Sequence, residues 1–481
     1  MMLAASDVAW SNEAWAAIPA LNLAQHGYMG TTVLASNGTW LVGIERHTYW
    51  MMPLHLLTQA AWYKMIGFSL FRQRLLSVLF GVVALGAWFI ITLRLSGNRA
   101  TALVSVLVIG FERNFLNAAA NGRMDMMTAA LGFSAIASYL MLAQREPGKA
   151  LLVSHSLAAA AILTHPCGVL FAAALVAIPF RTGNWRWSVA NCAALAVPYI
   201  VALASWGWYI AQAPSDFHAQ FFGNVSGFAG EYLQRERFSG VLAPWKAIWL
   251  EVKLRYLDSF GFGNLRTIPS LIAALWLIFA TGAATIAVSW RSLRQTNAVR
   301  VLSLCALVVF LTMALFEGMK FRHYLVHSLP FLGALAAIGW MGVWEERRSL
   351  RPLLFIALAT VLATQTAAVV EHFRRDPLKA ELGSAANWLK TALTPDDHLI
   401  APAEFGYALG FGSFLSDDVH LGFITGLSPD FIVTGGWYRE WIQNSSRREP
   451  AAYRYAQKLL HEDYTLVKTA GEYMIYQRNA R

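Results

Sequence analysis

Charged residues are scarce in this chain. Of its 481 residues, 14% are Asp, Glu, Lys or Arg, whereas roughly 25% of an average soluble domain is charged. This shortage, with 57% hydrophobic residues, 19 Trp and 28 Phe, argues against a soluble enzyme and indicates a polytopic membrane protein. The net charge of +10 lies in short groups between apolar runs and forms no basic face. Nucleic acid is therefore not an expected partner.

Cysteine is also rare. Cys167, Cys192 and Cys305 lie inside apolar segments and lack the spacing of metal ligands, so we expect small core residues there. The first residues, "MMLAAS", have neither the basic segment nor the apolar run of a cleavable signal peptide. The sequence thus predicts neither a disulfide framework nor a zinc site.

Long apolar runs are what the chain has in abundance. A run of roughly 17–25 residues is a candidate membrane helix, and ten such runs occur, the fourth and fifth separated only by "THPCG". They lie near residues 75–95, 101–119, 126–144, 149–165, 166–181, 187–210, 267–290, 299–316, 321–343 and 352–371.

The connections between these runs alternate in charge, which predicts their sidedness. The basic connections "RLSGNR", "REPGK", "RTGNWRW", "WRSLRQTNAVR" and "EERRSLR" are expected in the cytoplasm. The alternate connections, including residues 1–74, "NGRMDMM", the 211–266 loop and the tail after 372, are then external. Ten spans leave both termini outside, so we expect a further helix before Asp7, encoded by an upstream in-frame extension of about 20 apolar residues.

The external segments have structure of their own. Helical periodicity over 10–26, and again over 53–68, predicts two interfacial helices rather than spans. The strand-like pieces "HLIA", "DFIVT", "YTLVKT" and "EYMIYQ" predict a small α/β domain at the C-terminus. We therefore expect an external first loop (1–74), an all-α membrane bundle of 10–11 helices (75–371) and a periplasmic α/β domain (372–481).

Most of the suspicious polar residues fall on this external side, where ionisable groups at membrane depth are functional candidates. They are Asp7, Glu13, Glu45, Arg46, His47, Glu112, Arg113, Arg123, Asp125, His165, Lys320, Arg322 and His323.

Each candidate also has a purely structural interpretation. Arg123 and Asp125 can form an ion pair that anchors a helix end at the interface. Glu13 can be an exposed acid in a first helical turn, His165 can cap a helix, and "KFRH" can anchor a helix at the interface.

The order of several motifs resembles a known family. "SNEAWAAIPALNLAQHG", "MPLHLLTQAAWYKMIGF", "FRQRLLSVLFG", "NGRMDMMTAALGF", "LTHPCGVL" and "KFRHYLVHSLPFLGALAA" follow one another from about Asp7 to Ala337. They resemble successive motifs of the integral-membrane GT-C glycosyltransferases, which include protein O-mannosyltransferases (glycosyltransferase family 39 type) and bacterial aminoarabinose and related lipid-A sugar transferases. The family also begins with a membrane helix before its acidic loop.

The chain departs from the family in its acidic loop. Asn12 stands where the family has its first, catalytic acid, and Glu13 keeps the second acidic position. Asp7 is an additional acid upstream. Trp50 replaces an acid or His that many members carry before the prolines. The identity of the catalytic base is therefore left open between Glu13 and Asp7.

The resemblance implies sugar transfer from a polyprenyl-phosphate donor to a lipid, glycan or protein acceptor at the outer face of a bacterial inner membrane. It implies a carboxylate base, Glu13 or Asp7, with Asp125 as a second acid that orients the acceptor or a divalent metal. Arg123, Arg322 and His165 would surround the lipid phosphate, with Lys320 and Arg46 as further candidates. Asp125, Glu45 and His47 are the candidate ligands if a metal ion binds.

Two other classes remain open. One is a transporter or flippase of a lipid-linked sugar, although no inverted repeat with paired broken helices is visible. The other is a non-catalytic relative in which Asn12 marks a lost active site.

Overall fold

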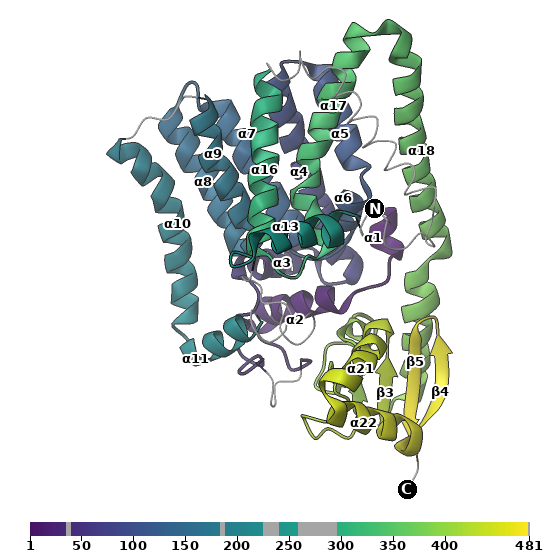
Figure 1. Ribbon diagram of the computed structural model, residues 1–481. Helices are drawn as coiled ribbons and strands as arrows, with labels where there is room; N and C mark the ends of the chain where they lie inside the picture. Colours follow the sequence, from purple (N-terminus) through teal and green to yellow (C-terminus); the bar gives the residue numbers. More distant parts are fainter. Residues whose placement is uncertain (35–39, 183–187, 225–239, 258–295, 480–481) are drawn as a thin grey trace.

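The computed structural model describes residues 1–34, 40–182, 188–224, 240–257 and 296–479 (Figure 1). The α-helices are α1 (Met2–Ser6), α2 (Ser11–His26), α3 (Pro53–Ile66), α4 (Leu70–Ser96), α5 (Arg99–Gly110), α6 (Arg113–Ala120), α7 (Asp125–Leu142), α8 (Pro147–Thr164), α9 (Val169–Thr182), α10 (Val189–Ile210), α11 (Pro214–Phe217), α13 (Pro244–Leu250), α16 (Asn297–Phe316), α17 (Leu329–Glu346), α18 (Arg351–Arg375), α19 (Ser384–Ala392), α20 (Gly406–Leu409), α21 (Gly436–Arg448) and α22 (Pro450–Lys458). The strands are β1 (Leu399–Ile400), β2 (Leu415–Ser416), β3 (Phe431–Thr434), β4 (Tyr464–Ala470) and β5 (Tyr473–Arg478).

The long apolar helices form one bundle. Figure 1 shows α4, α5, α7, α8, α9, α16 and α17 roughly alongside one another, with α10 at one flank and α18 at the other. Within the described residues, five helical segments are long and apolar enough to cross a membrane, or six if the bent pair α5–α6 counts as one. The expected span 267–290 lies outside the described residues. The all-α polytopic fold predicted from the sequence is confirmed.

Two expected spans are not straight helices. The 101–119 run is bent by 67° between α5 and α6, because the Glu112 carboxylate caps α6 by accepting hydrogen bonds from the backbone N–H groups of Asn114 and Phe115. The 321–343 run begins with a 3₁₀ helix, η5 (Arg322–His327), and α17 starts only at Leu329. Both breaks put irregular backbone at the end of the bundle that also carries the candidate site.

The core of the bundle is aromatic and tightly packed. Trp88 contacts Phe133 and Phe331 edge to face, with ring centroids 5.0 Å apart in each pair. Gly132 is required beside them, because a Cβ there would lie 2.1 Å from the Phe171 ring. This core holds α4, α7, α9 and α17 together.

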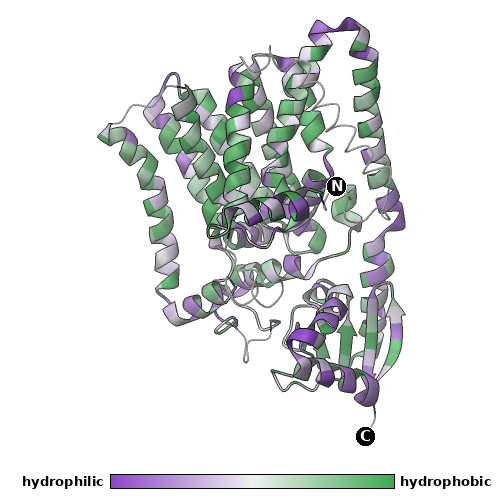
Figure 2. Cartoon of the chain, in the orientation of Figure 1, coloured by the Kyte–Doolittle hydropathy of each residue, from purple (hydrophilic) through white to green (hydrophobic). Residues whose placement is uncertain are grey.

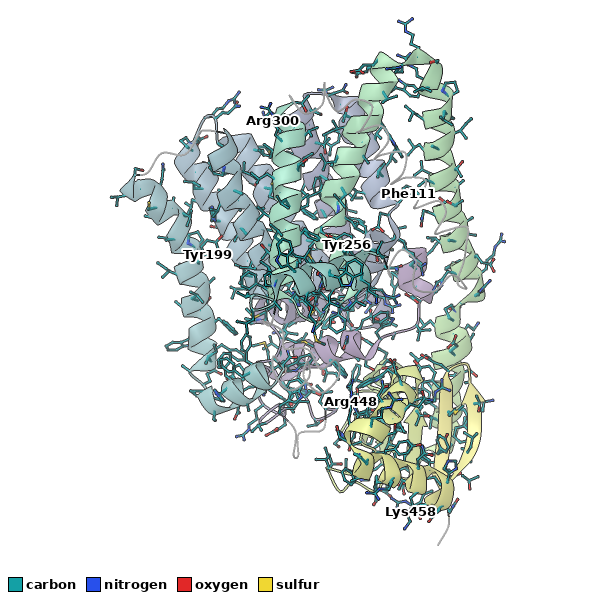
Figure 3. The ribbon with its side chains drawn as sticks, in the orientation of Figure 1. Phe111, Tyr199, Tyr256, Arg300, Arg448 and Lys458 are labelled. Atoms are coloured by element: carbon teal, nitrogen blue, oxygen red, sulfur yellow. The ribbon has the colours of Figure 1, made fainter. Side chains whose placement is uncertain are left out.

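The two ends of the bundle differ in polarity. The basic connections α4–α5, α7–α8 and α17–α18 lie at one end, where Figure 3 places Arg300, and the C-terminal domain with Arg448 and Lys458 lies at the other. Hydrophobic residues dominate the helices between these ends (Figure 2). The interfacial helices predicted over 10–26 and 53–68 are α2 and α3, and α2 lies between the bundle and the C-terminal domain.

The C-terminal domain is a five-stranded mixed sheet with strand order β2-β1-β3-β5-β4. Strand β1 pairs in parallel with β2 and β3, and β5 pairs antiparallel with β3 and β4. Apolar residues of α19 pack on one face and those of α21 and α22 on the other. The predicted α/β unit and four of its strands are therefore present. Helix α18 ends at Arg375, slightly beyond the predicted boundary at 372.

The C-terminal domain docks on the first turns of α2 through buried carboxyl groups. Ser11 donates a hydrogen bond of 2.6 Å to Glu404, and the indole N–H of Trp15 donates one of 2.7 Å to Asp417. Backbone pairing between Leu34 and Asp417 extends the sheet into the first loop. Burial raises the pKa of Glu404 to about 8 and that of Asp417 to about 6.

Docking of this domain is expected to weaken as the pH rises. A carboxyl whose pKa is raised in the folded state stabilises that state fully when the pH is below the pKa of the unfolded state. This stabilisation is lost as the pH rises through the pKa of the folded state. The melting temperature of the domain should therefore fall by several degrees between about pH 5.5 and pH 8.5. In Glu404→Gln, which removes one titrating group, the fall should be smaller. Thermal unfolding followed by intrinsic fluorescence measures this, and an equal pH slope in both proteins would contradict it.

Candidate active site

Glu13 lies at the centre of the polar network below the bundle. It is the third residue of α2, and its side chain is fully buried. Arg74 of α4 binds both of its carboxylate oxygens, at 2.8 Å and 2.7 Å. The backbone N–H groups of Gly122 and Trp10 donate the remaining hydrogen bonds, at 2.6 Å and 3.0 Å. Each oxygen thus accepts two hydrogen bonds, so no lone pair is left for a substrate proton.

The Gly122 contact fixes the loop that carries Arg123 and Asp125. Besides donating to Glu13, Gly122 accepts hydrogen bonds on its carbonyl oxygen from the amides of Gln59 and Gln73, at 3.0 Å and 3.1 Å. A Cβ at this position would lie 2.6 Å from the Gln73 amide nitrogen. Side chains of α2, α3 and α4 therefore all contact the backbone of Gly122, so Glu13 helps to fix the position of this loop.

Asp125 is the acid that the network leaves partly unused. It is the first residue of α7 and is 2% exposed. Its Oδ2 accepts a hydrogen bond of 2.8 Å from Nε of Arg123. Its Oδ1 is buried and has no hydrogen-bond partner among the residues that the structure describes. A buried carboxylate oxygen without a donor is costly, which makes Oδ1 the acceptor most in need of a ligand proton.

Histidine and tyrosine side chains from two further segments surround this pair. Arg123 Nη2 donates a hydrogen bond of 3.1 Å to Nε2 of His323 in η5. His165 accepts from the backbone N–H of Cys167 on Nδ1, and its Nε2 lies 3.3 Å from the Tyr324 hydroxyl. His165 thus caps the 3₁₀ turn after α8, as its structural interpretation predicted, and it also faces the Arg123–Asp125 region.

Two exposed arginines lie near this region, Arg113 of α6 and Arg322 of η5. Arg322 and Arg113 are both exposed, and no ion pair to either occurs within the described parts of the chain. They lie close enough for their positive charges to repel each other. Two neighbouring guanidinium groups can bind an anion, and the carboxylates of Glu112 and Asp7 also act on Arg113.

Lys320 is engaged elsewhere. Its ammonium group lies 3.1 Å from Glu251 and donates hydrogen bonds to the carbonyl oxygens of Ala314 and Met313, at 2.7 Å and 3.3 Å. Arg255 pairs with the same Glu251 and with Glu317. These two acids neutralise the two bases, so this buried group is a structural network that leaves Lys320 no free N–H.

The remaining predicted residues lie away from Asp125. Asp7 pairs with His372 of α18 at 3.3 Å, and its backbone carbonyl accepts from Arg74. Arg46 is exposed beside Glu45 at 3.5 Å. His47 lies 3.9 Å from Asp216.

The candidate metal ligands Asp125, Glu45 and His47 are not brought together. Among the described residues no three His, Cys, Asp or Glu side chains are placed to hold a metal ion.

Comparison with solved structures identifies the fold as that of the integral-membrane GT-C glycosyltransferases, as the sequence motifs predicted. The chain is similar to ArnT from Cupriavidus metallidurans bound to undecaprenyl phosphate (TM-score 0.63, 15% identity, 100% of this chain and 95% of that chain). It is also similar to the archaeal oligosaccharyltransferase AglB from Archaeoglobus fulgidus in complex with an inhibitory peptide and a dolichol-phosphate (TM-score 0.53, 12% identity, 98% and 71%). The sequence matches no family model and no curated protein.

Proposed function

We propose that this protein is a membrane glycosyltransferase that transfers a sugar from a polyprenyl-phosphate donor to an envelope acceptor at the face of the bundle bearing the C-terminal domain. This face is the periplasmic side of a bacterial inner membrane. The observation that carries the proposal is the free, buried Oδ1 of Asp125 beside Arg123, in a fold shared with two proteins whose structures hold polyprenyl or dolichyl phosphate.

Asp125 is the proposed general base. The acceptor hydroxyl forms a C–O bond with the anomeric carbon of the donor sugar while the bond from that carbon to the phosphate oxygen breaks. The hydroxyl proton passes to Oδ1 of Asp125, and the bond electrons leave with the polyprenyl phosphate. Such proton transfer contributes about 10²–10⁴-fold. Of the bases expected from the sequence, Glu13 has both carboxylate oxygens hydrogen-bonded, and Asp7 has one oxygen 3.3 Å from Nε2 of His372.

Cations around Asp125 are the proposed phosphate ligands. The departing polyprenyl phosphate gains a negative charge, which Arg322 and Arg113 stabilise from the exposed mouth. Arg123 is bound to Asp125 at rest. It becomes a stronger phosphate ligand as Asp125 takes the proton, because its own counterion is then neutralised. His165 completes the set.

The test is transfer of labelled sugar in proteoliposomes from a panel of polyprenyl-phosphate sugars. The proposed enzyme releases free polyprenyl phosphate in proportion to the sugar transferred. Movement of intact donor across the bilayer without release would identify a flippase instead. Neither release nor movement, from a protein that is folded by its melting curve, would identify a non-catalytic relative.

A further inference from the structure

A row of tryptophans lies between the candidate active site and the C-terminal domain. The rings of Trp15 and Trp50 are 5.8 Å apart, those of Trp15 and Trp437 are 6.1 Å apart, and those of Trp40 and Trp50 are 5.9 Å apart, each pair edge to face. All four side chains are half-buried. The row joins the first loop to α21 of the domain, and we call it the tryptophan row.

The middle of the tryptophan row, Trp50 and Trp15, lies beside the segment that carries the proposed base. Trp15 and Trp50 pack in the same apolar cluster as Met124, the residue that precedes Asp125. Trp437, at one end of the row, is on α21 of the C-terminal domain, and Trp40 is at the other end. The row therefore connects the C-terminal domain with the first loop and passes beside Met124.

We propose that the tryptophan row binds a neutral oligosaccharide and holds it as the acceptor, with its terminal hydroxyl at Asp125. This inference rests on the proposed glycosyltransferase function and names the acceptor class. Sugar rings present apolar C–H faces and hydroxyl edges, and half-buried indole rings offer matching apolar faces with N–H donors. Recognition of such a ligand needs an aromatic surface and a few placed polar groups.

Unused polar groups lie along the row. The Trp50 indole N–H is buried without an acceptor among the residues that the structure describes. Asn12 lies three residues before Trp15 on the same face of α2. Its half-buried amide makes no hydrogen bond within the described parts of the chain. An indole N–H and an amide can each bind sugar hydroxyls. The carboxylate of Asp417 beside the row is already engaged, because it accepts from Trp15, Tyr438 and the backbone.

The same surroundings disfavour other acceptors. A phosphorylated lipid acceptor would need cations along the row, and the exposed arginines Arg113 and Arg322 are instead on α6 and η5. A peptide acceptor that adds a strand would need an open sheet edge. The edge of β2 that borders the first loop is already paired through Leu34 and Asp417.

The first test measures binding to the full-length protein in nanodiscs without donor. The probes are gluco-, manno-, galacto- and arabino-oligosaccharides of two to six residues, and binding is followed by calorimetry. We expect at least one probe to bind, Trp437→Ala to weaken its affinity about tenfold, and Trp50→Phe to weaken it several-fold through loss of the N–H. Trp208→Ala, at a 79% exposed position on α10, is the matched control and should bind normally. The absence of binding by every probe, or equal affinity in Trp437→Ala, would refute the inference.

The second test separates acceptor from donor. In the transfer assay, Trp437→Ala should raise the KM for the oligosaccharide and leave the KM for the polyprenyl-phosphate sugar unchanged. A raised donor KM alone would mean that the row holds the sugar of the donor, and efficient transfer only to peptide or lipid would also overturn the acceptor assignment. Because binding is measured without donor, a protein that binds oligosaccharide but transfers nothing refutes the glycosyltransferase proposal alone.

Discussion

Replacing Asp125 by asparagine is expected to lower the rate of sugar transfer by about 10²–10⁴-fold, the usual contribution of a general base. The amide cannot accept the acceptor proton at Oδ1, a buried carboxylate oxygen that has no hydrogen-bond donor among the described residues. The KM for donor should fall modestly, because Arg322 and Arg113 are untouched and Arg123 loses its counterion. Initial rates in proteoliposomes measure this, with the exposed Asp396→Asn as the matched control.

The asparagine variant also removes the counterion of Arg123, so its stability has to be measured. Asp125→Glu keeps the charge and moves the carboxylate by one methylene. It should melt close to the wild type and still lose most of its activity, because proton transfer requires hydrogen-bond distance. Wild-type rates in both variants, with unchanged melting temperatures, would show that Asp125 is only half of a structural ion pair.

Replacing Glu13 by glutamine is expected to destabilise the protein by about 3–5 kcal/mol, the cost of leaving a buried charge without its partner. The charge is that of Arg74, which is 1% exposed and would keep the backbone carbonyls of Ala4, Asp7 and Val8 and the more distant carboxylate of Asp7, but no directly bound carboxylate. Transfer should fall too, because the Glu13–Gly122 contact positions Asp125. Thermal unfolding in detergent measures the first effect, and exposed Glu45→Gln, with an effect within about 0.5 kcal/mol, is the control.

A second substitution tells a positioning role from a catalytic one. Glu13→Gln combined with Arg74→Met removes both charges and should recover part of the lost stability, which the double-mutant cycle quantifies. If Glu13→Gln instead melts like the wild type and has no activity, Glu13 is the base that its sequence position indicated.

Much of the fold could be predicted from local patterns. Apolar runs and basic connections predicted the helix bundle and its two ends. Helical periodicity predicted the bounds of α2 and α3 to within about two residues. Four of the five strands were predicted from short strand-like pieces of sequence. These helices and strands depend mainly on residues that are close together in the sequence, so local patterns could predict them. The breaks before α6 and α17 were missed, because a capping carboxylate and a 3₁₀ turn do not change the hydropathy of a run.

The candidate site divides in a similar way. The sequence by itself determined which residues could do chemistry, including Arg123, Asp125 and Arg322, and that they lie on one side of the bundle. Only the tertiary structure decided how Glu13 and Asp125 are held. Glu13 is saturated by Arg74, 61 residues away, and by Gly122, 109 residues away, whereas Asp125 keeps one oxygen without a donor. Contacts between residues so far apart produce no pattern in a single sequence. The sequence therefore could not show that Glu13 is buried and fully hydrogen-bonded.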